Sequence, residues 1–170
     1  MSNVQDVAAD LGDILRQTVP ALEAIGEADS LRLRGAGSWS RKQIVGHLID
    51  SALNNLHRFV RAQQTEELVF PGYDQRRWVD AGGYAERPWR DLVGLWGALN
   101  AQVAHVIAGI APERLGTPCR IGDGPPVSLE LVARDYVKHL RHHLEQILDP
   151  AASLGKAYES LAEPTPGPRA

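Results

Sequence analysis

The stretch SLELVARDYVKHLRHHLEQI, residues 128–147, decides the fold of this chain. Its apolar side chains recur at spacings of three and four residues, which is the pattern of a helix that buries one face against other helices. Ser128 is a good N-cap, and the Asp149-Pro150 pair that follows the stretch stops the helix. The packed face consists of Leu129, Ala133, Tyr136, Leu140, His143 and Ile147. The sequence therefore predicts a long amphipathic helix here.

Two similar helical patterns lie in the first half of the chain. The first covers about residues 4–25, and Pro20 should kink it or start a second piece. The second begins after Ser40, where Gln43 three residues later completes a capping box. It keeps its apolar face to about residue 64, so both segments are expected to pack as helices.

A third pattern starts at Pro88, which suits the first turn of a helix. Its apolar stripe consists of Leu92, Trp96, Leu99, Val103, Val106 and Ile110. Two long connections remain, 65–87 and 111–127, in which we expect a short helix at 74–79 and a small hairpin around 122–124. Because no strand pattern competes, the predicted fold class is all-α. We expect a four-helix bundle with long connections between helices 2 and 3 and between helices 3 and 4.

The composition is that of one globular domain. The 170 residues are 44% hydrophobic and 23% charged, with a net charge of −3. We assign residues 1–162 to a single helical domain and the proline-rich residues 163–170 to a disordered tail. Residues 1–6 lack the basic region of a signal peptide, and no apolar run approaches the roughly 20 residues of a membrane span. We therefore expect a cytoplasmic protein with no membrane partner.

The single cysteine, Cys119, excludes an intrachain disulfide and a cysteine-rich metal site. No nucleophile motif surrounds it, so an incidental loop thiol is the favoured interpretation. The slightly acidic balance and the lack of a basic face argue against a nucleic-acid partner.

The six histidines differ in where helix geometry places them. Taking Leu140 as the centre of the packed face, at about 100° per residue, His143 lies about 60° and His139 about 100° to the same side. Four residues apart, these two imidazoles are close enough to share one ion. His142 lies about 160° away, so we expect it to point to solvent.

His47, on the second predicted helix, also lies at the edge of an apolar face, about 100° from Leu48. With His139 and His143 it would complete a three-ligand site with an open position, as in catalytic metal centres. A lone histidine at a helix edge is more often a hydrogen-bonded structural residue than a metal ligand. For the pair His139 and His143, both the structural and the metal-ligand interpretation remain open. The remaining histidines, His57 and His105, are expected in solvent.

Three segments resemble the DinB-like proteins, in the YfiT-like branch whose members are named metal-dependent hydrolases. They are WSRKQIVGHLIDSALNN (39–55), FPGYDQ (70–75) followed by Trp78-Val79, and YVKHLRHHLEQI (136–147). The resemblance covers about residues 4–150, in order and with the right gaps. It implies a four-helix bundle, often a homodimer, with one divalent ion, nickel or zinc, held by three histidines. Carried over position by position, the ligands are His47, His139 and His143.

Relatives in that family include thiol S-transferases that use bacillithiol and maleylpyruvate isomerases that use mycothiol. The expected function is accordingly a metal-dependent transferase or hydrolase acting on a small molecule, the former with a low-molecular-weight thiol co-substrate. Asn54, Arg58 and Tyr73 are the predicted substrate-binding residues, with Arg58 facing a carboxylate. Asp135 could orient His139, although an exposed charge near the start of its helix is the favoured interpretation. We assign no general base.

The alternative is a non-catalytic metal-binding bundle that serves as a stress-response or dimerisation module. It predicts a bound ion without a coordination position that a substrate can reach. DNA binding is a third interpretation, and the acidic charge balance argues against it.

Overall fold

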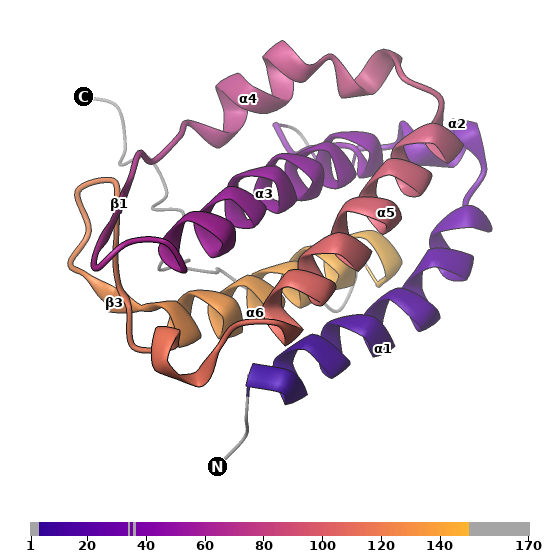
Figure 1. Cartoon of the computed structure of the whole chain (residues 1–170). Coiled ribbons are helices and arrows are strands. Elements are labelled where there is room, and N and C mark those ends of the chain that lie inside the picture. Colours follow the sequence, from indigo (N-terminus) through magenta and orange to yellow (C-terminus); the bar gives the residue numbers. More distant parts are fainter. Residues whose placement is uncertain (1–3, 34, 36, 150–170) are drawn as a thin grey trace.

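Four long helices form the body of the chain in the computed structural model, which describes residues 4–33, 35 and 37–149 (Figure 1). They are α1 (Val4–Glu23), α3 (Arg41–Ala62), α5 (Trp89–Ala108) and α6 (Leu129–Leu148). The predicted all-α bundle is confirmed. The expected tail at 163–170, and the end of the expected domain after residue 149, lie outside the described residues.

The order of the helices around the bundle differs from their order in the chain. α1 packs on α5 and α6, and α3 packs on the same two helices. Helices α1 and α3, which follow one another along the chain, therefore occupy opposite corners, as do α5 and α6. In an up-and-down bundle, by contrast, consecutive helices are neighbours joined by short loops. The arrangement brings α3 and α6 together, and these helices carry the three candidate ligands.

Local signals fixed the helix ends as expected. Ser40 and Gln43 form a capping box at the start of α3, and the Ser128 hydroxyl accepts a hydrogen bond from the backbone N–H of Leu131. Pro20 lies inside α1, which continues to Glu23 as one helix. The short helix predicted in the first long connection is α4 (Gln75–Gly82), capped by Asp74.

A three-stranded sheet closes one end of the bundle, where α3 ends and α6 begins (Figure 1). The strands are β1 (Leu68–Phe70), β2 (Pro118–Ile121) and β3 (Val127–Ser128). β2 and β3 form the predicted hairpin, and β1 pairs with β2 in parallel, with Leu68 opposite Cys119. The sequence did not indicate β1, because three residues are too few for a strand pattern and its partner is distant along the chain.

Three shorter helical segments, α2 (Glu27–Ser30), η1 (Tyr84–Glu86) and η2 (Pro112–Arg114), complete the connections. The Glu27 carboxylate on α2 accepts hydrogen bonds from the buried ammonium of Lys42 and from the backbone N–H of Trp89. One side chain thus ties α2 to the start of both α3 and α5.

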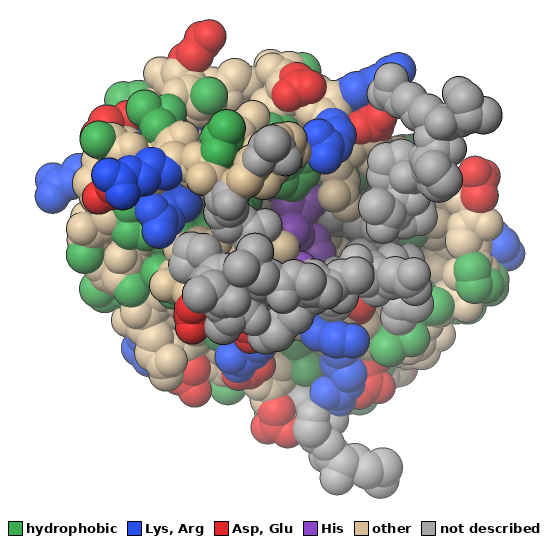
Figure 2. Space-filling model, turned by 180° about the vertical axis from the view of Figure 1, so that it is seen from behind, with side chains coloured by type: hydrophobic (Ala, Val, Ile, Leu, Met, Phe, Trp, Pro, Cys, Tyr) green, Lys and Arg blue, Asp and Glu red, His purple; other side chains and the backbone are tan. Residues whose placement is uncertain are grey.

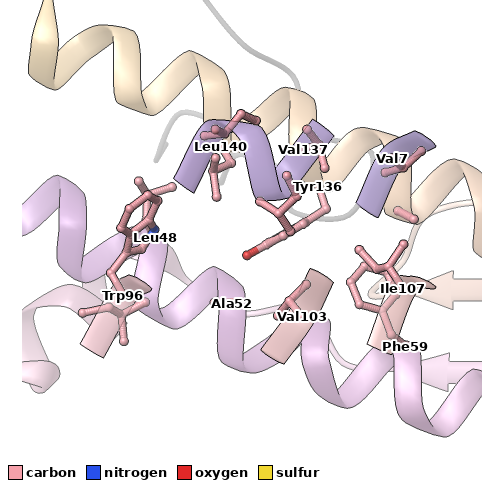
Figure 3. Close-up of a cluster of buried hydrophobic side chains, with 14 of the residues drawn as sticks. Val7, Leu48, Ala52, Phe59, Trp96, Val103, Ile107, Tyr136, Val137 and Leu140 are labelled. Atoms are coloured by element: carbon pink, nitrogen blue, oxygen red, sulfur yellow. The ribbon is translucent and has the colours of Figure 1, made fainter. Parts of the chain in front are cut away.

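The core lies between the four long helices, each of which contributes apolar side chains (Figure 3). One polar pair crosses it: the Tyr136 hydroxyl on α6 donates to Oδ1 of Asn100 on α5 at 2.5 Å. Among the described residues, no helix is long and apolar enough to span a lipid bilayer.

Candidate metal centre

Three histidines converge between α3 and α6. His47 comes from α3, and His139 and His143 come from successive turns of α6. Each offers a ring nitrogen, and these nitrogens all lie within 4.8 Å of one another. The Nε2 atoms of His47 and His139 are 3.1 Å apart. Figure 2 shows histidine side chains that are visible from one face of the molecule.

The separations suit a first-row metal ion. Imidazole nitrogens bound to zinc at about 2.0–2.1 Å in a tetrahedral site lie about 3.3 Å from one another. The His47–His139 separation of 3.1 Å is close to that value. A ring nitrogen of His143 lies within 4.8 Å of both, so the donor set fits one ion held by three imidazoles.

Burial keeps two of these imidazoles neutral. His47 is fully buried and His139 is 3% exposed. Burial lowers the pKa of His47 well below its usual value, and the neighbouring His143 and His139 lower it further. Burial lowers the pKa of His139 to about 4, against the opposing effect of Asp135. At neutral pH both rings therefore present lone pairs, as a metal ligand must.

The surroundings of the triad correct two expectations. Asp135, for which exposure was the favoured interpretation, is only 6% exposed, and its negative charge raises the pKa of His139. His142 was expected in solvent, but it is half-buried and its ring centroid lies 5.1 Å from that of His143. A helical angle places a side chain relative to its own helix and takes no account of the neighbours that cover it.

Trp39 packs beside His47 with ring centroids 5.2 Å apart.

Two of the three predicted substrate-binding residues lie along α3, beyond His47. Arg58 is fully buried, and its guanidinium carbon lies 5.3 Å from the Phe70 ring centroid. Its positive charge lowers the pKa of His139, which places it within electrostatic reach of the triad. Asn54 is buried, and its amide donates to the backbone oxygen of Asp50 at 2.9 Å.

Tyr73, the third predicted substrate-binding residue, belongs to the loop that precedes α4. It is half-buried and packs against Trp78 with ring centroids 4.9 Å apart. It lines a cavity of about 940 Å³ between residues 69–74 and residues 122–124. The structure thus places Tyr73 beside a loop cavity, and it buries Arg58 on α3 within electrostatic reach of His139.

Two polar features near the triad escaped the sequence reasoning. Gln146, one turn beyond His142 and His143, hydrogen-bonds to both. Asp50, one turn after His47, accepts a hydrogen bond from the Tyr84 hydroxyl at 2.5 Å. The spacing of Gln146 from His143 on one helix face could have revealed the first. The hydrogen bond between Tyr84 and Asp50 could not be foreseen, because it depends on the path of the loop that carries Tyr84.

The Tyr84 ring packs closely on the backbone of α3 at Gly46. A Cβ added at Gly46 would overlap that ring. We expect Gly46→Ala to lower the free energy of unfolding by about 1–3 kcal/mol, the usual cost of overpacking. Urea denaturation measures this change in the free energy of unfolding.

Gly94→Ala on α5 is the matched control, because no atom lies within 4 Å of the added methyl. Alanine in a helix gains up to about 1 kcal/mol over glycine, so this variant should be neutral or more stable. Removing the ring with Tyr84→Ala should make the Gly46→Ala change less costly. Equal effects of the two glycine replacements would refute the contact.

Cys119 lies in β2, fully buried. Burial raises the pKa of its thiol to about 11. The chain therefore provides no reactive thiol of its own at neutral pH.

Comparison with known proteins agrees with this geometry. Residues 11–147 match the model of the DinB superfamily. A protein of Oceanobacillus iheyensis named "putative metal-dependent hydrolase" is 26% identical over 138 residues, which are 81% of this chain and 78% of that protein. A protein of Halalkalibacterium halodurans with the same name is 24% identical over 124 residues, which are 73% of this chain and 72% of that protein.

A solved structure, that of YfiT from Bacillus subtilis, superposes with a TM-score of 0.78 at 20% identity. The match covers 92% of this chain and 91% of YfiT, which is described as "a probable metal-dependent hydrolase with an unusual four-helix bundle topology". At this identity the likeness concerns the fold. It agrees with the helix arrangement observed here, in which α1 and α3 occupy opposite corners of the bundle, as do α5 and α6.

Proposed function

The chain belongs to the DinB superfamily, and on that premise we propose that it is a metal-dependent enzyme with one divalent ion held by His47, His139 and His143. The observation that carries the proposal is the convergence of three ring nitrogens from two helices, two of the rings being buried and neutral. Nickel and zinc are the proposed ions, because both accept imidazole ligands.

Each element of the site has a distinct task in this proposal. His47 and His139, fixed by packing, would hold the ion from the two neighbouring helices α3 and α6. Three neutral ligands leave the ion its full charge, and when bound it supplies Lewis acidity that makes a water or a thiol ionise near neutral pH. The buried positive charge of Arg58 favours a substrate with a carboxylate or another anionic group, and Asn54 and Tyr73 are proposed to contact the same small molecule.

Thiol transfer and hydrolysis need the same arrangement of ligands. If the reaction is a thiol transfer, the thiol comes from a separate small molecule, because Cys119 is buried and protonated at neutral pH. We therefore propose a transferase or hydrolase acting on a small molecule, in which a water or an external thiol is the nucleophile.

Turnover assays distinguish these reactions. Tag-free protein loaded with zinc or nickel is mixed with a chromogenic electrophile and a panel of low-molecular-weight thiols, and separately with chromogenic esters and amides. Transferase activity should require a thiol, whereas hydrolysis should not. Either activity should fall to background with a chelator and in His139→Ala, and should persist in Cys119→Ala.

Turnover that survives both the chelator and His139→Ala would contradict the proposed metal dependence. A stoichiometrically bound ion without turnover in either panel would instead favour a non-catalytic metal-binding bundle.

A further inference from the structure

Gln146 joins two histidines at the edge of the proposed metal centre. It is half-buried on α6, three residues after His143 and four after His142. Its Oε1 lies 2.9 Å from Nδ1 of His143, and its Nε2 lies 2.9 Å from Nε2 of His142. One amide therefore bonds to both rings at once, on the side of His143 away from its own Nε2.

The chemistry of metal ligation gives both hydrogen bonds a direction. An imidazole that binds an ion through Nε2 carries its proton on Nδ1. Nδ1–H of His143 then donates to Oε1 of Gln146, which accepts. The Gln146 amide N–H in turn donates to Nε2 of His142, which accepts as a neutral ring. A single orientation of the amide satisfies both bonds.

His143 needs such a support more than the other two histidines. His47 and His139 are buried, so packing already restrains their rings. His143 is only half-buried, and packing leaves its ring freer to turn. A hydrogen bond at Nδ1 restrains both its orientation and its tautomer, which a ligand needs for tight metal binding.

We infer that Gln146 is a positioning residue that holds His143 with Nε2 presented to the ion, and that His142 steadies Gln146 in turn. This inference rests on the proposed metal centre. Gln146 makes no contact with the ion itself in this account, and it acts through His143.

Zinc affinity, measured by competition with a chelator, tests the inference. Gln146→Leu keeps a similar size but removes both hydrogen bonds, and it should weaken zinc binding about 10–100-fold, as the loss of a ligand's hydrogen-bond partner does. Gln146→Glu retains an acceptor for Nδ1–H of His143 and should bind zinc as tightly as the wild type or more tightly. Gln102→Leu, which replaces an exposed glutamine on α5, is the matched control and should bind as the wild type.

The cobalt-substituted protein gives a second readout. Gln146→Leu should change the visible ligand-field spectrum of bound cobalt, whereas the melting temperature of the metal-free protein should stay unchanged. Wild-type zinc affinity in Gln146→Leu would overturn the inference and leave the metal centre intact. Failure of the wild type to bind zinc or cobalt would instead overturn the proposed centre, and this inference with it.

Discussion

Replacing His139 with alanine should reduce the bound metal from about one ion per chain to less than about a tenth of that. His139 is 3% exposed and its Nε2 lies 3.1 Å from that of His47, so it is a buried member of the proposed ligand set. The two remaining imidazoles come from different helices, and structural and catalytic zinc sites use at least three protein ligands. Elemental analysis of protein purified without a histidine tag measures the change.

The same variant should also lose stabilisation by metal. An ion that binds only the folded chain stabilises it by about 4 kcal/mol at 1,000 times its dissociation constant. The wild type should therefore melt at a higher temperature with added metal, and His139→Ala should not. His105→Ala is the matched control, because His105 is exposed on α5. Unchanged metal content in His139→Ala, or an equal loss in His105→Ala, would contradict the assignment.

Replacing Trp89 with alanine should lower the free energy of unfolding by about 3–5 kcal/mol, the usual cost for a buried aromatic side chain. Trp89 is 1% exposed at the start of α5. Its indole N–H donates to the backbone oxygen of Leu22 at 2.8 Å, which links α5 to the end of α1. Alanine leaves a cavity and removes one of the two hydrogen bonds that the Leu22 oxygen accepts, the other coming from the backbone N–H of Ile25. Equilibrium unfolding in urea measures the change.

Two variants separate the causes of this loss. Trp89→Phe keeps an aromatic ring and removes the indole N–H, so it should cost less than Trp89→Ala but still about 1 kcal/mol for the hydrogen bond. Trp78→Ala, at a tryptophan that is 42% exposed on α4, should cost under about 1 kcal/mol. An effect at Trp89 no larger than at Trp78 would show that α5 does not depend on this anchor.

The helices were predictable because their signals are local. Apolar spacing identified the four long helices, and Ser40 and Ser128 marked where two of them begin. The corner that each helix occupies was not predictable, because spacing defines a buried face without naming the helix that covers it. β1 escaped for a related reason, since its three residues find their partner in β2, far along the chain.

In the candidate site, too, some residues were predictable from local sequence signals and others were not. Helical angles placed His47, His139 and His143 at the edges of apolar faces, and the structure brings these three together. The same angles failed for His142, and the expectation that Asp135 is exposed near the start of its helix was also wrong. The structure covers both side chains more than their own helix implies. The burial of Arg58 depends on distant residues such as Phe70, which no periodicity within α3 could reveal.

Anomalous diffraction from crystals of the tag-free protein at the absorption edge of its metal tests the central claim most directly. One peak per chain is predicted between α3 and α6, about 2.0–2.1 Å from one ring nitrogen of each of His47, His139 and His143 if the ion is zinc. A peak elsewhere, or a peak in contact with fewer than three of these histidines, would contradict the account.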